Sequence, residues 1–197
     1  MELKEKEERE ERKRQTKRKL ASLAMDEDLF VPKEYIIFTE WLRIQARVLY
    51  RQFTFVVDGD TYCGKTMYLK TMLPGKTFIC NCRGVEHPDL RDFEGLPYED
   101  NILFDEGGPQ MVQLHRDLFQ APKHDITLGQ SGTNCYAYKV NVFRVRLAIT
   151  CNDWKAALQK LAESDRKWVE KNTMVLSIDE YMFNRHIVMS QEHPNPV

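Results

Sequence analysis

The sequence predicts an α/β fold: a three-layer αβα sandwich with a largely parallel sheet, preceded by a charged helical arm. Two observations support this prediction. Short apolar runs rich in β-branched and aromatic residues alternate with segments of helical periodicity, which is the pattern of strand–helix–strand units. The first 20 residues are nearly all Glu, Lys and Arg. Because they have no apolar face to bury, we expect them to form a solvated helix outside the core.

The expected elements follow from apolar runs and from the positions of Pro and Gly. The run Phe53–Val57 is continuously apolar apart from Thr54, as in a parallel strand that is buried on both faces. Strands are expected at 53–57, 77–80, 101–104, 145–150 and 174–178, and helices at 36–51, 67–72, 111–119, 154–161 and 166–171. These elements predict an arm at 1–31, one domain at 32–190 and a tail at 191–197.

Composition limits the classes of partner. The net charge of the 197 residues is −1, so any contact with nucleic acid is expected to be a local basic stripe. No apolar run reaches the length of about 18 residues that crosses a membrane, and no membrane partner is expected. The cysteines are odd in number and scattered through apolar segments, which indicates free thiols in an intracellular protein. They are Cys63, Cys80, Cys82, Cys135 and Cys151.

One segment has the pattern of a phosphate-binding loop, Gly-x-x-x-x-Gly-Lys-Thr. Its residues are Gly59, Asp60, Thr61, Tyr62, Cys63, Gly64, Lys65 and Thr66. The segment lies between a predicted strand and a predicted helix, the context in which glycines let backbone amides face phosphate oxygens. Lys65 is expected to contact the β- and γ-phosphates without contributing to the core, and Thr66 to hold Mg²⁺. The alternative is a glycine-containing turn followed by an unrelated lysine.

Polar residues also end two later strands. Asp105 and Glu106 follow the apolar run 101–104. Asp105 is expected to bind Mg²⁺ through water, and Glu106 to orient or deprotonate an attacking water molecule. Asn152 follows the strand at 145–150 and could hold that water with its amide. The alternative for Asn152 is a cap on the next helix.

In this order, the motifs Gly59–Thr66, Asp105-Glu106 and Asn152 resemble those of the superfamily 3 helicases. These are the hexameric ATPase modules of small DNA-virus and plasmid replication proteins, and the helicase half of rolling-circle replication initiators is the most similar. The resemblance spans about residues 35–180 and implies a P-loop NTPase fold. It also implies ATP and Mg²⁺ as cofactors, single-stranded DNA or RNA as a partner, and a homo-oligomer such as a hexamer.

The same resemblance assigns individual roles. Lys65 would be a catalytic phosphate ligand, Asp105-Glu106 the acidic pair and Asn152 the sensor. Arg166 would be an arginine finger acting on a neighbouring subunit, although Lys167 is an alternative and a surface salt bridge fits either residue. The family's basic hairpin corresponds to residues 130–139, in which Lys139 is the one basic residue. Lys139 is therefore the expected nucleic-acid contact.

Two other function classes stay open. A P-loop kinase would bind a small phosphoryl acceptor near Glu106, but the Arg-rich lid typical of kinases has no counterpart after residue 120. A non-hydrolysing relic of a replication protein would bind nucleotide only, and the acidic pair weighs against it. In each case Cys63 is expected to be a reactive thiol, because its neighbours are Lys65 and inward-facing amides.

Overall fold

The computed structural model of the chain describes residues 31–47, 52–129 and 137–184. Most of the predicted arm, the tail at 191–197, the end of the helix predicted to reach residue 51, and Cys135 lie outside these ranges. The elements in chain order are β1 (Val31–Pro32), α2 (Ile36–Gln45), β2 (Thr54–Gly59), α3 (Lys65–Met72), β3 (Thr77–Asn81), β4 (Asn101–Asp105), α4 (Pro109–Leu114), α5 (Arg116–Gln120), β5 (Ile126–Leu128), β6 (Tyr138–Val140), β7 (Arg146–Cys151), α6 (Trp154–Leu158), α7 (Glu163–Asn172), β8 (Thr173–Ile178) and β9 (Phe183–Asn184). None of the helices within the described ranges has the length and apolar character needed to cross a membrane.

The chain divides into two compact units. In the smaller unit, β1 and β9 form an antiparallel pair in which Val31 lies opposite Asn184. The larger unit, Glu34–Met182, contains the remaining elements and all of the residues predicted to form a site.

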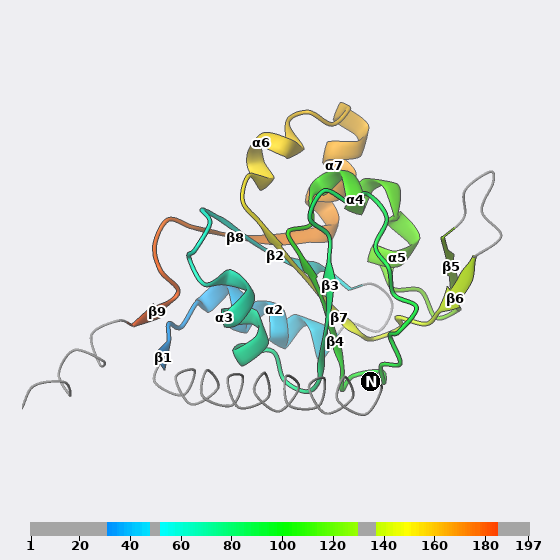
Figure 1. Cartoon of the computed structure of the whole chain (residues 1–197), viewed down its shortest axis with the longest axis horizontal. Helices are drawn as coiled ribbons and strands as arrows, with labels where there is room; N and C mark the ends of the chain where they lie inside the picture. Colours follow the sequence, from blue (N-terminus) through cyan, green and yellow to red (C-terminus); the bar gives the residue numbers. More distant parts are fainter. Residues whose placement is uncertain (1–30, 48–51, 130–136, 185–197) are drawn as a thin grey trace, which may run out of the picture. The chain divides into compact units, whose positions relative to one another are not determined.

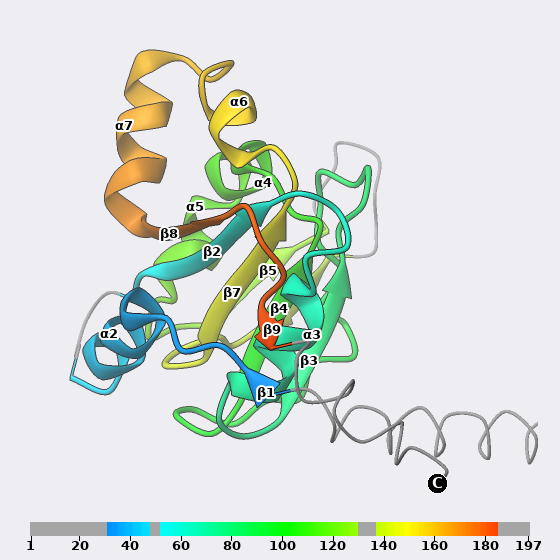
Figure 2. The same cartoon turned by 90° about the vertical axis from the view of Figure 1, so that its left-hand side faces the viewer.

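The larger unit is built on a five-stranded sheet with the order β3-β4-β7-β2-β8. All neighbouring strands in it are parallel. In Figures 1 and 2, α2 and α3 cover one face of the sheet, and α4, α5, α6 and α7 lie on the other. The prediction of an α/β fold with a parallel sheet between helices is confirmed at this level.

The strand β2 is fixed from the α2 side by aromatic packing and by hydrogen bonds. Phe38, Trp41, Phe55 and Tyr68 are fully or nearly fully buried, and their neighbouring ring centroids are 5.1–5.8 Å apart. Trp41 Nε1 and Gln45 Nε2 each donate a hydrogen bond of 2.7 Å to the carbonyl oxygen of Phe53. Because α2 holds the start of β2 in this way, the loop after β2 leaves the sheet from a fixed point.

The predicted helix at 111–119 is wrong in its continuity, because the structure has two helices there. α4 and α5 are separated at His115, which has φ −112° and ψ +48°. The His115 Nε2 atom lies 3.2 Å from the carbonyl oxygen of Glu86 and 3.0 Å from His87 Nδ1. These contacts come from a distant segment, so helical periodicity could not reveal the break.

The short strands β1, β5, β6 and β9 are also absent from the prediction. Each has only two or three residues, too few to show an alternation of apolar and polar side chains.

Candidate functional site

The loop Gly59–Thr66 connects β2 to α3 at the carboxyl end of an interior strand of the sheet. Two of its glycines meet local requirements. At Gly59 a Cβ atom would collide with the carbonyl oxygen and side chain of Ile178, on the adjacent strand β8. Gly64 has φ +81°, in the left-handed region that glycine adopts without steric cost. The path of the loop therefore depends on glycine at both positions.

The helix α3 begins at Lys65, directly after the loop, and no side chain caps its amino end. The first backbone N–H groups of a helix have no partner within the helix, and they form the positive end of its dipole. Gly64, Lys65 and Thr66 line a cavity at this end. The arrangement suits an anion such as phosphate.

This cavity has a volume of about 440 Å³, within the range of small-molecule sites. It lies at the carboxyl ends of β2, β4 and β7. The connection after β2 passes to the α3 face of the sheet, and the connection after β7 passes to the α6 face (Figure 2). Ligands of parallel α/β proteins bind where the connections diverge in this way. The lining residues are Thr61, Tyr62, Cys63, Gly64, Lys65, Thr66, Met67, Lys70, Ile79, Asp105, Glu106, Thr150 and Asn152.

Lys65 is buried and fully hydrogen-bonded. Its Nζ atom donates to the carbonyl oxygens of Gly59 and Asp60, at 2.6 and 2.7 Å, and to Asn152 Oδ1 at 2.8 Å. An ammonium group has three N–H donors, and each has an acceptor here. The expectation that Lys65 contributes nothing to the core is therefore wrong, since its side chain is buried and its bond to Asn152 joins the loop to the residue that follows β7.

Asn152 does not cap the helix α6, which was the alternative for this residue. Its side-chain oxygen accepts from Lys65, and the first backbone N–H of α6 donates elsewhere. Trp154 N donates to Asp58 Oδ1 at 2.9 Å, so a buried aspartate of β2 holds the start of α6. Asp58 thereby ties β2 to the segment after β7 and helps to keep Asn152 beside Lys65.

Thr66 and Asp105, the predicted Mg²⁺ ligands, are brought together. The Thr66 hydroxyl donates to Asp105 Oδ1 at 2.6 Å, and the Thr150 hydroxyl donates to the same oxygen at 2.8 Å. Hydroxyl and carboxylate oxygens are the ligand types that Mg²⁺ prefers, and Mg²⁺ usually takes few of them from the protein. The chemistry of these side chains fits this cation.

Glu106 occupies an unusual backbone conformation, with φ +58°. Its backbone N–H donates to Thr150 Oγ1 at 3.0 Å, and its side chain lines the same cavity as Lys65. The Glu106 Oε2 atom forms an ion pair with Arg83 Nε at 3.2 Å. A non-glycine residue in the left-handed region costs free energy, and such residues are frequent at functional sites.

The remaining predicted residues have other positions. Gly59 and Asp60 line an adjoining cavity that also includes Asn152. Arg166 and Lys139, both within the described part of the chain, line neither of these cavities. Arg166 lies on α7 and donates to Gln159 Oε1 at 3.1 Å. Lys139 is exposed on β6, which pairs with β5 in an antiparallel hairpin whose tip lies outside the described residues.

Two side chains of the site were missed in the sequence. Thr150 joins the acidic pair, since its hydroxyl bonds both the Asp105 carboxylate and the Glu106 backbone. A threonine two residues before Asn152, in a strand that is apolar after Arg146, is a signal that could have been recognised. Arg83 has no comparable signal, because its proximity to Glu106 arises from strand pairing.

Thr150→Val is expected to lower the free energy of unfolding by about 1–3 kcal/mol, because the Glu106 N–H loses its acceptor while the side-chain shape is kept. Chemical denaturation measures this change. Thr127→Val on β5 is the matched control, since Thr127 is exposed, and its effect should stay within about 0.5 kcal/mol. Equal stability of Thr150→Val and wild type would show that the hydroxyl bridge is energetically unimportant.

The described cysteines differ in their environments. Cys63 is half-buried beside the cavity, whereas Cys80, Cys82 and Cys151 are buried. Burial raises the pKa of Cys151 to about 11. The Cys82 thiol donates to the Cys80 sulfur at 3.7 Å, which raises the pKa of Cys82 and lowers that of Cys80. Although the pKa of Cys80 is lowered, burial limits access to its thiol.

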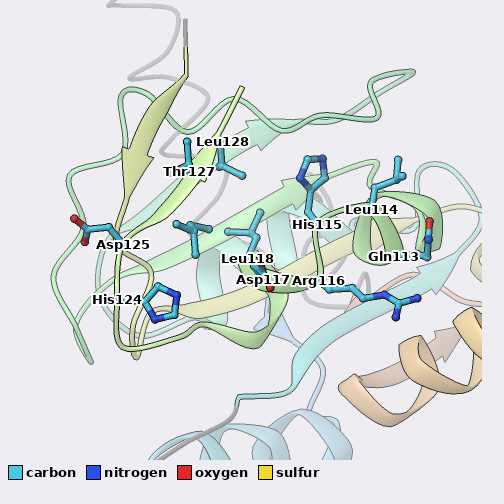
Figure 3. Close-up of a pocket in the computed structure, with 11 residues that line it drawn as sticks. Gln113, Leu114, His115, Arg116, Asp117, Leu118, His124, Asp125, Thr127 and Leu128 are labelled. Atoms are coloured by element: carbon cyan, nitrogen blue, oxygen red, sulfur yellow. The ribbon is translucent and has the colours of Figure 1, made fainter. Parts of the chain in front are cut away.

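A further cavity, of about 460 Å³, contains none of the predicted site residues. In Figure 3, Gln113, Leu114 and His115 come from the α4–α5 side of it, and His124, Asp125 and Thr127 from the β5 side. Burial and the neighbouring His87 lower the pKa of His115. We assign no chemistry to this cavity.

No family model matches the chain, and no curated protein has significant sequence similarity to it. A functional assignment for the larger unit therefore depends on the geometry of its own residues.

Proposed function

We propose that the chain is a P-loop NTPase that binds ATP with Mg²⁺ in the cavity beside Gly59–Thr66 and hydrolyses it. One observation carries this proposal. Five polar side chains from the phosphate loop and the ends of two other strands converge at the carboxyl ends of β2, β4 and β7, next to the amino end of α3. They are Lys65, Thr66, Asp105, Glu106 and Asn152.

Each of these groups has a role in binding or in the transfer of the phosphoryl group to water. The loop amides and the end of α3 would hold the phosphates, and Lys65 would neutralise charge on the β- and γ-phosphates. Thr66 and Asp105 would hold Mg²⁺, which when bound supplies charge stabilisation on the phosphate oxygens.

Hydrolysis forms a bond between the water oxygen and the γ-phosphorus and breaks the bond from that phosphorus to the ADP oxygen. Glu106 would orient the water and accept its proton. Asn152 would donate or accept a hydrogen bond at the same water, because it lies beside Lys65, which would contact the γ-phosphate that this water attacks. The remaining negative charge develops on ADP and phosphate, where Lys65 would stabilise it.

We further propose that hydrolysis is coupled to single-stranded nucleic acid in a ring, as in superfamily 3 helicases. The order of the motifs and the β5–β6 hairpin between Asp105 and Asn152 support this proposal. Lys139 on that hairpin would contact the nucleic acid. Arg166 would complete the site of a neighbouring subunit, a role compatible with its position outside the cavity of its own chain.

The test is steady-state ATP turnover with and without single-stranded DNA or RNA. Turnover that nucleic acid stimulates supports the translocase, and turnover that requires a small acceptor supports a kinase instead. ATP binding without any turnover would indicate the non-hydrolysing relic of a replication protein instead. No binding by titration calorimetry would reject the nucleotide site.

Brief treatment with iodoacetamide is expected to modify Cys63 first, and bound Mg-ATP is expected to protect it. Cys63 is more accessible than the other described cysteines, and phosphate in the loop would block it. Peptide mapping measures both effects, with Lys65→Ala as the control that should lose the protection. First reaction at Cys80 or Cys82, or equal labelling of Cys63 with and without nucleotide, would contradict this loop arrangement.

A further inference from the structure

The charged residue that pairs with the candidate general base comes from a segment outside the phosphate-loop motifs. Arg83 lies just after β3, and its Nε atom is 3.2 Å from Glu106 Oε2. This Nε group carries a single N–H, so the contact engages one carboxylate oxygen. The other oxygen, Oε1, is not part of this ion pair.

The backbone sets this proximity. In the pairing of β3 with β4, Asn81 lies opposite Asp105. Cys82 N extends the pairing by donating to the Asp105 carbonyl oxygen at 2.8 Å, and Arg83 N donates to Asn81 Oδ1 at 3.1 Å. Arg83 and Glu106 therefore emerge side by side from two strands whose register is fixed.

The ion pair itself contributes little to folding, because the Arg83 side chain is 81% exposed and exposed pairs are screened by water. Its effect falls on Glu106. The Glu106 backbone is already held by its bond to Thr150, and Arg83 is the ion-pair partner of its carboxylate.

We propose that Arg83 is a positioning residue that orients the Glu106 carboxylate for proton transfer, an inference that rests on the ATPase activity proposed above. Arg83 fixes Oε2 and leaves Oε1 to accept the proton of the attacking water. It acts through Glu106 and does not bind the nucleotide.

The test compares kcat and KM for ATP in Arg83→Ala, Arg83→Lys and wild type. Misplacement of a catalytic group by about 1 Å costs up to about a hundredfold in rate, so kcat of Arg83→Ala should fall between about tenfold and a hundredfold. KM and the Kd for ATP should change by less than about threefold, since binding groups are intact. Arg83→Lys should recover part of the loss, because it retains a cation. Arg91→Ala is the matched control, as Arg91 pairs with Asp89 on the same exposed segment.

A double-mutant cycle separates positioning from a general structural effect. In the Glu106→Gln background, Arg83→Ala should cause no further loss, because residues that act as one unit are not additive. The proposal is overturned by wild-type kcat in Arg83→Ala, by an equal further loss in the Glu106→Gln background, or by a loss confined to KM. The last result would indicate a phosphate contact. Absence of turnover in wild type would reject the ATPase and this role together, whereas a normal rate in Arg83→Ala rejects the role of Arg83 alone.

Discussion

Lys65→Ala is expected to remove measurable binding of Mg-ATP. Truncating one partner of a buried charged contact typically costs about 2–5 kcal/mol, which is roughly thirtyfold to several-thousandfold in Kd. The variant should also unfold more readily, because the buried Lys65 bonds the oxygens of Gly59, Asp60 and Asn152. Titration calorimetry measures the binding, and thermal melting shows whether the variant is folded at the temperature of the titration.

Lys76→Ala is a suitable control for this experiment. Lys76 is exposed and lies beyond the other end of α3, outside the lining of the cavity. Its removal should leave ATP affinity unchanged. If folded Lys65→Ala binds ATP as tightly as wild type, the cavity beside Gly59–Thr66 is not the nucleotide site.

Glu106→Gln is expected to lower ATP turnover by about 10²- to 10⁴-fold, the usual effect of losing a positioned acid or base. The amide keeps the size of the side chain but cannot accept the proton, so ATP should still bind. Asp105→Asn should act differently and raise the Mg²⁺ concentration required for half-maximal rate. Both effects are measured by steady-state kinetics with Mg²⁺ titration.

Glu40→Gln provides the comparison for loss of a carboxylate elsewhere. Glu40 pairs with Arg43 on α2 and does not line the cavity, so its variant should turn over ATP at the wild-type rate. Wild-type turnover in Glu106→Gln would mean that the proton is accepted by another group. Tight binding of ATP with greatly reduced turnover in Glu106→Gln is the result that agrees with the proposal.

The sequence was informative where the determinants are local. The strands β2, β4 and β7 were predicted because each contains an apolar run of the length of a typical strand. These runs are buried in the structure. The phosphate-loop residues were recognised because their pattern is contiguous. The roles expected for Asp105 and Asn152 in a nucleotide site also placed them near Lys65, and the three residues line one cavity in the structure.

Features that depend on register or on distant contacts could not be predicted. Arg83 meets Glu106 because Asn81 lies opposite Asp105, a pairing that neither strand specifies alone. Asp58 caps a helix that begins far along the chain. The interruption at His115 depends on contacts with a distant loop. In each case the energetic reason for the local geometry comes from a partner that sequence periodicity does not identify.

Because Gly59 lies tightly against Ile178, the presence of glycine at this position is not by itself a sign that the chain still binds nucleotide. A descendant that had stopped using nucleotide would still need glycine there, because a Cβ atom would collide with the end of β8. Selection for a correctly packed sheet alone would preserve Gly59, the first residue of the phosphate-loop motif. Drift after loss of activity should therefore be sought at Glu106, whose side chain is 36% exposed and has no packing role of this kind.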